Sequence, residues 1–312
     1  MRKHRGRVRG LSPRIETPHP ATILRIVATF SHKGRREEEP PLFSSPTPSA
    51  KPRAMNRTGL FIALALALVL GLLFGIYPEL DLKLAALFYD AADKTFPLKL
   101  NNLAAFARDG AMWIAWGLAL PAIGALVIKL ARPDRPLLMS GRAIVFLLVT
   151  LSLSAGVLTN LTFKSYWGRP RPITVTQFNG DQVFVPWWDP RGGCGRNCSF
   201  FSGEGATAFW TYAPAALTPP AWRPLAYAAA TLFGVTTSVL RMAFGGHFFT
   251  DVAAAGLVTF LVIWLVHGYI YRWPSTRRSD ADVDAALTRF AWPGYRMVQR
   301  WLGNETGPTP SA

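Results

Sequence analysis

One short polar stretch between two apolar runs contains the residue types that phosphoryl transfer needs. Arg241, His247 and Asp251 lie in it, and Gly245-Gly246 just before the histidine favours a turn. A helix that begins near His247 would place it four residues from Asp251 on one face, where the carboxylate could accept the Nδ1 proton. Nε2 would then be free as a nucleophile, and Arg241 and the helix N-terminus could bind a phosphate. Taken singly, the histidine could be interfacial and the acid a first-turn residue.

A polar loop at 164–204 carries a second set of candidate groups at its two ends. It begins with three cations, Lys164, Arg169 and Arg171, which could meet lipid headgroups or bind a phosphate. It ends in Ser-Gly-Glu at 202–204, a pattern typical of a helix N-cap followed by an acid in the first turn. Long ordered loops tend to be functional, so both ends are candidates for one site.

The order and spacing of these groups resemble the three-part signature of the type 2 phosphatidic acid phosphatase family, which shares its site with vanadium haloperoxidases. The resemblance covers about residues 59–271. Its three motifs are Lys164 with Arg171-Pro172, Ser202-Gly203, and Arg241 with His247 and Asp251. It implies phosphatase chemistry through a phosphohistidine, without a metal. In that chemistry His247 attacks phosphorus, Asp251 orients it, and the phosphate oxygens are held by Lys164, Arg171, Ser202, the Gly203 amide and Arg241.

Two positions depart from the family pattern. Leu240 stands where the family usually has a serine before the arginine, and Glu204 stands where it has the histidine that protonates the leaving group. We expect Glu204 to be a carboxylate that holds Arg171 or Arg241 in place or orients the attacking water, although a general-acid role stays open. Without the family's acid, the enzyme should favour substrates whose leaving group departs easily.

The chain has 312 residues, half of them hydrophobic, and these collect in runs of about 15 to 25 residues, long enough to span a bilayer. We predict an all-α fold, a bundle of six transmembrane helices with an ordered outer-face loop and an interfacial amphipathic helix within residues 78–110. The predicted spans are 59–77, 111–131, 143–163, 205–217, 224–244 and 247–271. A weak amphipathic stretch, 283–302, follows them.

The two ends of the chain differ from its apolar middle. Residues 1–54 hold 12 Lys and Arg against 4 Asp and Glu and lack a core-forming pattern, which indicates a disordered basic leader more than a nucleic-acid-binding arm. Met55 directly precedes a long apolar run and could be the true start. We therefore predict a six-span phosphatase domain at 55–272 and a cytoplasmic tail at 273–312.

Charge and cysteine placement predict the topology. Basic residues in 129–142 and from Arg272 onward favour cytoplasmic termini, with the polar loop on the outer face. The two cysteines, Cys194 and Cys198, both lie in that loop, where an oxidising compartment would allow a disulfide. We predict a multi-pass protein of the bacterial inner membrane whose active site faces the periplasm. No cluster of metal ligands is evident in the sequence, and we expect no cofactor.

These patterns together predict an integral membrane phosphatase acting on a lipid phosphate monoester. The sequence Cys-Ser-Phe-Phe-Ser-Gly-Glu at 198–204 most resembles that of bacterial lipid A 1-phosphatases, and this resemblance implies lipid A 1-phosphate as the substrate. Three alternatives stay open: an undecaprenyl-diphosphate or phosphatidylglycerophosphate phosphatase, a lipid phosphotransferase, and a non-catalytic lipid-phosphate binder. A binder needs no oriented nucleophile, so the pairing of His247 with Asp251 disfavours it. The predicted partners are the lipid substrate and the bilayer, with neither nucleic acid nor an obligate protein partner.

Overall fold

A computed structural model describes residues 57–303 of the chain, and the predicted leader, 1–54, lies outside them. The described residues are helical and form no β-strand, as the sequence predicts. The α-helices are α2 (Arg57–Ile76), α3 (Glu79–Ala86), α4 (Asn102–Ala131), α5 (Gly141–Leu151), α6 (Lys164–Tyr166), α7 (Gly203–Phe209), α8 (Tyr212–Leu217), α9 (Arg223–Ala243), α10 (Phe249–His267) and α11 (Asp280–Trp301). Two π-helical segments (Ser152–Phe163 and Gly268–Arg272) join α5 to α6 and extend α10, and three short 3-10 turns are Pro97–Leu100, Pro172–Thr174 and Thr176–Phe178.

Five helical segments are long and apolar enough to cross a bilayer: Arg57–Ile76, Asn102–Ala131, Gly141–Tyr166, Arg223–Ala243 and Phe249–Arg272. The sequence predicted six such spans. The remaining one, 205–217, forms two short helices, α7 and α8, with Trp210 and Thr211 between them. Pro214 accounts for this break, because a proline ring clashes with the carbonyl four residues earlier, here that of Trp210.

The predicted interfacial segment, 78–110, is only partly a helix of its own. α3 covers its first residues, but α4 begins at Asn102, well before the predicted start of the span at 111. The Asn101 side chain caps this earlier start by accepting a hydrogen bond from the Ala104 amide at 2.9 Å. Polar residues such as Arg108 and Asp109 interrupt the hydrophobic run in the first turns of α4, so the run alone indicates a later start.

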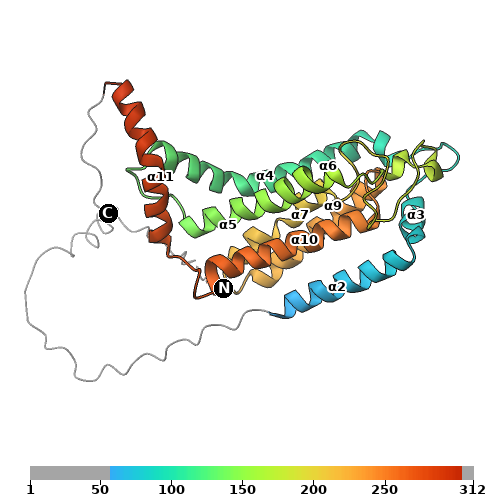
Figure 1. Cartoon of the computed structure of the whole chain (residues 1–312), viewed down its shortest axis with the longest axis horizontal. Helices are drawn as coiled ribbons and strands as arrows, with labels where there is room; N and C mark the ends of the chain where they lie inside the picture. The colour runs from blue at the N-terminus through green and yellow to red at the C-terminus, as the bar shows by residue number, and fades with distance from the viewer. Residues whose placement is uncertain (1–56, 304–312) are drawn as a thin grey trace, which may run out of the picture. The chain divides into compact units, whose positions relative to one another are not determined.

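The short helices α7 and α8 run antiparallel to α9 inside the bundle (Figure 1). The Tyr212 hydroxyl of α8 lies 2.8 Å from Thr231 Oγ1 of α9. Glycines allow this close approach: a Cβ at Gly234 would lie 2.3 Å from the Phe209 ring, and a Cβ at Gly256 of α10 would lie 2.9 Å from it. Phe209 therefore fixes α7 between α9 and α10.

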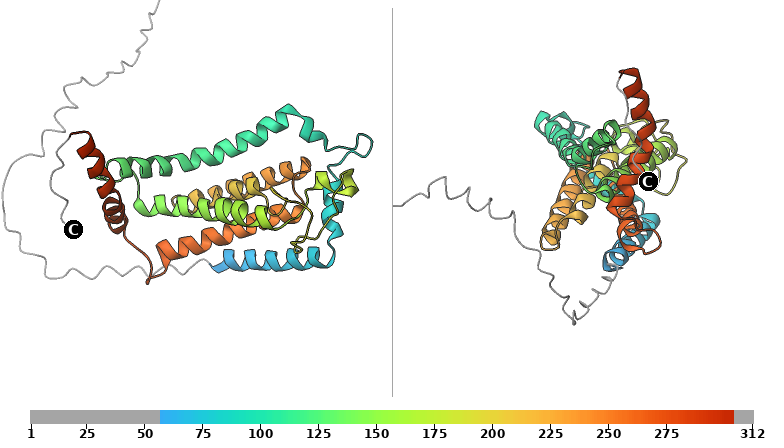
Figure 2. Two further views of the ribbon diagram at one scale, coloured as in Figure 1. Left: turned by 45° about the horizontal axis from the view of Figure 1, so that its top comes forward. Right: turned by 90° about the vertical axis from the view of Figure 1, so that its left-hand side faces the viewer.

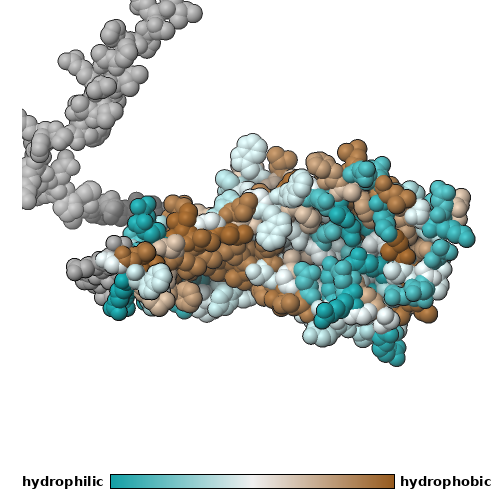
Figure 3. All heavy atoms as spheres, turned by 90° about the horizontal axis from the view of Figure 1, so that it is seen from above, coloured by the Kyte–Doolittle hydropathy of each residue, from teal (hydrophilic) through white to brown (hydrophobic). Residues whose placement is uncertain are grey.

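Large apolar side chains cover much of the outside of the helices. Phe61 and Leu68 of α2 are 63% and 62% exposed, and Trp113 and Leu120 of α4 are each 60% exposed. On the face drawn in Figure 3, hydrophobic residues form a broad area and hydrophilic residues gather toward one end. Such a surface is unfavourable in water and suits contact with lipid chains.

The two ends of the bundle are built differently (Figures 1 and 2). At one end, α11 packs where α4 ends and α5 begins. Ion pairs fix it there: Lys129 Nζ lies 2.8 Å from Asp284 Oδ1, and Arg142 Nη2 lies 2.8 Å from Asp280 Oδ2. At the other end lie α3, the long loop 167–202 and the turn between α9 and α10.

Candidate active site

The predicted site residues meet at the loop end of the bundle. They come from different elements: Lys164 from α6, Ser202 and Gly203 from the start of α7, Arg241 from the last turn of α9, and Asp251 from the first turn of α10. His247 lies in the turn between α9 and α10 and is only 1% exposed. The turn requires glycine at 245, where φ is +63° and a Cβ would lie 2.6 Å from the Phe96 ring.

The hydrogen bond made by the His247 ring fixes its tautomer. Nδ1 lies 2.7 Å from the main-chain carbonyl oxygen of Ser199. A carbonyl oxygen only accepts, so Nδ1 carries the proton and Nε2 carries the free electron pair. This corrects the prediction that the Asp251 carboxylate accepts the Nδ1 proton. The distance from Nδ1 to Asp251 Oδ2 is 3.8 Å, an electrostatic contact and not a hydrogen bond.

Asp251 is fully buried and its two oxygens have different partners. Oδ2 accepts from the Phe248 amide at 2.7 Å and from the Ser199 hydroxyl. Oδ1 accepts from Arg169 Nη1 at 2.5 Å. The carboxylate therefore orients His247 through Ser199, whose hydroxyl it binds and whose carbonyl holds the ring. Its negative charge also stands close enough to stabilise positive charge on the imidazole.

Two buried ion pairs, Asp81 with Arg169 and Arg169 with Asp251, hold Asp251 in place. The sequence did not predict these pairs. Arg169 is 0% exposed and Nη2 lies 2.7 Å from Asp81 Oδ2 of α3. Asp81 also accepts from the Thr250 amide at 3.0 Å and from the Thr250 hydroxyl at 2.6 Å. The guanidinium packs 4.5 Å from the centre of the Phe248 ring. Asp81, Arg169 and Thr250 thus pin the start of α10, which carries Asp251.

The environment of His247 keeps it neutral. Burial lowers the pKa of its imidazole to about 4, and the nearby Arg241 and Arg171 act in the same direction, against the Asp251 carboxylate. A neutral imidazole with its proton on Nδ1 has a nucleophilic Nε2 at neutral pH. The resting site therefore holds an imidazole whose Nε2 is able to act as a nucleophile.

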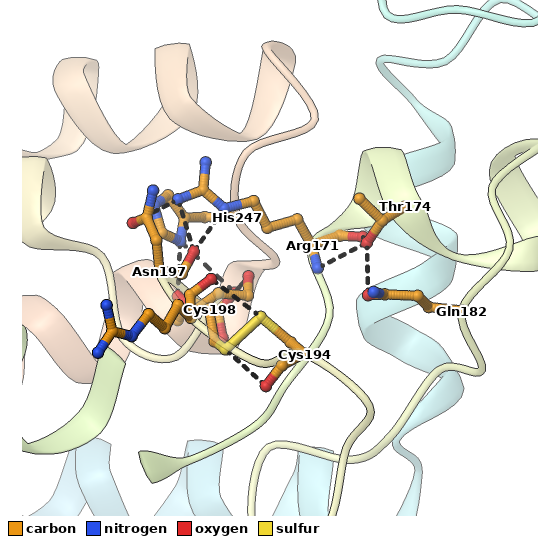
Figure 4. Close-up of a disulfide and its surroundings, with 10 residues drawn as sticks. Arg171, Thr174, Gln182, Cys194, Asn197, Cys198 and His247 are labelled. Atoms are coloured by element: carbon orange, nitrogen blue, oxygen red, sulfur yellow. Dashed lines mark hydrogen bonds and ion pairs between the residues drawn. A yellow bond between two sulfur atoms is a disulfide. The ribbon is translucent and has the colours of Figure 1, made fainter. Parts of the chain in front are cut away.

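Three cations, Lys164, Arg171 and Arg241, lie close enough to interact electrostatically with one another, and the two arginines also act on His247. Lys164 Nζ lies 3.1 Å from the point that a Cβ at Gly203 would occupy, so the ammonium faces the N-terminus of α7. The Arg171 guanidinium donates to the Asn197 carbonyl at 3.1 and 2.9 Å and to Asn197 Oδ1 at 2.8 Å (Figure 4). Arg241 is 6% exposed. Positive side chains and a helix N-terminus suit an anion with several oxygens.

Ser202 caps α7, as the sequence predicts: its Oγ accepts from the Gly205 amide at 3.1 Å. The hydroxyl proton remains available to a ligand. Glu204 lies in the first turn of α7. Its Oε2 is 2.8 Å from Arg241 Nε, and the two groups form an ion pair without hydrogen-bond geometry. Glu204 thus lies against the predicted partner Arg241. The pair leaves a net charge of +2 from Lys164, Arg171, Arg241 and Glu204.

A disulfide closes the loop that holds Asn197. Cys194 and Cys198 are bonded, with their Cα atoms 5.7 Å apart (Figure 4). Main-chain hydrogen bonds attach the ring at both ends, from the Cys194 amide to the Gly168 carbonyl at 3.0 Å and from the Cys198 amide to the Lys164 carbonyl at 3.3 Å. Asn197, which the sequence gave no reason to single out, is held between the two cysteines and orients Arg171.

The arrangement suits in-line displacement at a phosphate monoester. It offers one nucleophilic nitrogen, three cations and the amides of a helix N-terminus around it. Within residues 57–303 no group of three or more His, Cys, Asp or Glu could hold a metal ion. Arg169 is neutralised by its two carboxylate partners and is not free to bind substrate.

Comparison with known proteins identifies the family of the chain. Residues 143–275 match the model of the PAP2 superfamily. A lipid A 4'-phosphatase of Francisella tularensis subsp. novicida is 33% identical over 223 residues, covering 70% of this chain and 98% of that protein. A lipid A 4'-phosphatase of Rhizobium leguminosarum is 35% identical over 113 residues, covering 36% of this chain and 48% of that protein. No solved structure matches the chain. By identity and coverage, the chain belongs to the PAP2 superfamily and is a phosphoric monoester hydrolase.

Proposed function

We propose that this protein is a membrane phosphatase that removes a phosphate monoester from lipid A. The observation that carries the proposal is the similarity to the Francisella lipid A 4'-phosphatase, which extends over 98% of that protein. The site described above supports it, because nucleophile and cations lie at one end of a bundle whose sides are apolar. A lipid anchored in the bilayer would present its headgroup phosphate at that end.

The proposed reaction has two displacements at phosphorus. In the first, Nε2 of His247 forms a bond to phosphorus as the ester P–O bond breaks, and the lipid leaves as its alcohol after taking a proton. In the second, water attacks the phosphohistidine, the P–N bond breaks, and inorganic phosphate is released. Lys164, Arg171 and Arg241 neutralise the oxygens in both steps, and Ser202 and the Gly203 amide donate to them.

The role proposed for Glu204 is to position Arg241. The 2.8 Å ion pair needs the carboxylate form, which has no proton to give to the leaving group. The first step would then depend on a proton from water or on a leaving group that departs without one. This favours the 1-phosphate as a second candidate, because an anomeric oxygen leaves more readily than a ring alcohol.

The position of the phosphate on lipid A is the finer part of the proposal. The names of the three relatives favour the 4'-phosphate. The Glu204–Arg241 pair favours the 1-phosphate that the sequence analysis preferred. We propose the 4'-phosphate, because identity over nearly the whole length of a relative outweighs one substituted acid.

We also propose that the phosphatase domain, 55–272, crosses the bilayer six times, with the site facing the periplasm. We propose that α7 and α8 together form the sixth crossing. Glu204 contacts Arg241 near the end of α9, and Phe209 contacts Gly234 nearer its middle, so the two short helices run antiparallel to α9. The segment 203–217, α7 and α8 with the two residues between them, reaches about 22 Å at a helical rise, less than the ~30 Å of hydrocarbon. The Thr218–Pro220 segment would complete the path to the cytoplasmic face.

The test uses the purified full-length protein in lipid nanodiscs with lipid A that carries both phosphates. Phosphate release is measured, and the product is treated with mild acid, which cleaves an anomeric phosphate and leaves a 4'-phosphate in place. A product that loses its second phosphate in mild acid supports the 4' assignment. Turnover of phosphatidylglycerophosphate or undecaprenyl diphosphate with none of lipid A would overturn the substrate assignment while leaving the hydrolase intact.

A further inference from the structure

Helix α11 (Asp280–Trp301) is amphipathic, and the protein itself covers only part of its apolar face. Asp280 and Asp284 form the ion pairs that hold its first turns against α5 and α4, and Ala291, two turns after Asp284, is buried. Beyond Ala291 the helix exposes large apolar side chains. Met297 is 70% exposed and Trp301 is 89% exposed.

The exposed apolar side chains form one stripe. Phe290, Met297 and Trp301 stand at positions i, i+7 and i+11, which coincide on a helix surface, and Phe290 is 78% exposed. Val298, next to them, is 51% exposed. Four large apolar side chains in one stripe are unfavourable in water, because each leaves apolar surface unburied. The stripe therefore requires an apolar surface.

A basic stripe runs beside the apolar one. Arg289, Arg296 and Arg300 follow the same i, i+7, i+11 spacing, one residue earlier. Arg296 and Arg300 line an open hollow of about 410 Å³ whose other walls are Pro293, Met297 and Trp301. Neither arginine has an ion-pair partner among residues 57–303. Two guanidiniums one helical turn apart can bind the phosphate of a lipid, while the apolar side chains beside them contact its acyl chains.

The placement of α11 agrees with an occupant in the membrane. It lies across the ends of the spanning helices (Figures 1 and 2), at the end opposite α3. His247 lies at the α3 end, in the turn between α9 and α10. The last turns of α4 beneath α11 expose Val127 and Ile128, which continue the lipid-facing surface. We propose that α11 lies in the plane of the bilayer surface, with its apolar stripe in the acyl chains and Arg296 and Arg300 on the phosphate of an anionic phospholipid.

A second copy of the chain fits this surface less well than a lipid does. Pairing two copies through this face would bring two rows of arginines together without counter-charges, which is unfavourable. Anionic headgroups supply the missing charge, and one juxtamembrane arginine near such a surface changes binding about fivefold. The proposal goes beyond the phosphatase reaction, and its test does not depend on turnover.

The test places a polarity-sensitive dye on one introduced cysteine in the full chain, Met297→Cys or the matched Ala285→Cys on the polar face. The disulfide occupies both natural cysteines, so labelling without reductant is specific. Each protein is placed, one copy per nanodisc, in phosphatidylcholine alone or mixed with phosphatidylglycerol. Quenching by acrylamide, which is neutral, reports exposure of the dye to water.

We expect the dye at 297 to be blue-shifted and protected once phosphatidylglycerol is present, and the dye at 285 to stay accessible. Arg296→Gln with Arg300→Gln should raise the phosphatidylglycerol fraction needed for half protection by about fivefold per arginine. Arg277→Gln with Arg278→Gln removes the same charge outside the helix and should shift it less. The proposal would be overturned if acrylamide quenched the dyes at 297 and 285 equally, or if the two double arginine substitutions shifted the half-protection point equally. It would also be overturned if the dye at 297 were protected only in nanodiscs that hold two copies of the protein.

Discussion

Replacing Asp81 with asparagine should damage the active site from a helix that contributes no group to the phosphate. Asp81 lies on α3, and its Oδ2 receives Arg169 Nη2 at 2.7 Å and the Thr250 hydroxyl at 2.6 Å. Arg169 in turn contacts Asp251. Asparagine can still accept from Thr250, but its amide group would face the guanidinium, donor against donor.

The size of the effect follows from burial. Asp81 and Arg169 are 1% and 0% exposed, and removing one partner of such a pair costs about 3 to 5 kcal/mol. The start of α10 would also move, since the lost oxygen, Oδ2, accepts from the Thr250 hydroxyl at 2.6 Å and from Arg169, which in turn contacts Asp251. A shift of about 1 Å in catalytic groups costs about 100-fold in rate. We therefore expect kcat to fall about 100-fold, with a smaller change in KM because the phosphate cations are untouched.

The assay combines thermal unfolding in detergent with phosphate release from lipid A. Glu79→Gln is the matched control, because it makes the same chemical change at an exposed position in the first turn of α3. It should change stability by less than about 1 kcal/mol. Asp81→Glu keeps the negative charge on a side chain that is one methylene longer. Its kcat should lie between those of the wild type and Asp81→Asn. If Asp81→Asn behaves like Glu79→Gln in both measurements, the ion-pair reasoning is wrong.

Four further outcomes are expected. His247→Ala should abolish turnover and lose the acid-labile phosphoenzyme seen with radiolabelled substrate, while the protein stays folded. Because burial lowers the pKa of His247 to about 4, below its unfolded value of ~6.5, its contribution to stability is present above pH 6.5 and lost as pH falls toward 4; His247→Gln should flatten unfolding temperature across that window. Gly246→Ala, whose Cβ would lie 2.6 Å from Arg241 Nη2, should lower kcat/KM at least about tenfold, unlike Gly124→Ala, which meets nothing within 4 Å. Cys194→Ser with Cys198→Ser should cost about 2 kcal/mol and raise KM by releasing Asn197 from Arg171, and an unchanged KM would contradict that link.

The local patterns in the sequence predicted most of what lies along the chain at short range. Apolar runs predicted the long helices, the glycine pair predicted the turn before α10, and Ser202 predicted the N-cap of α7. The family resemblance grouped Lys164, Arg171, Arg241 and His247; the first and third lie at helix ends, and the other two lie in the long loop and in the turn before α10. These helices, turns and caps depend on residues a few positions apart in the sequence, because helix propensity and N-capping are local interactions.

The partners that lie far apart in sequence could not be predicted in the same way. Nothing in the composition of α3 distinguishes Asp81 from Glu79, yet only Asp81 reaches Arg169, 88 residues later. The choice of the Ser199 carbonyl over Asp251 as the partner of His247 depends on a main-chain direction within a long loop. Such contacts are set by how the loop folds against α10, and no periodicity records them.

The main-chain carbonyl that holds His247 has a consequence for how the site tolerates mutation. Every residue type at position 199 brings a carbonyl oxygen, so no single substitution there deletes the acceptor of the Nδ1 proton. A substitution such as Ser199→Ala removes only the hydroxyl that reaches Asp251. Substitutions at position 199 therefore leave the His247 tautomer unchanged. Insertions or deletions in the loop would move the carbonyl and disturb the tautomer more than substitutions do.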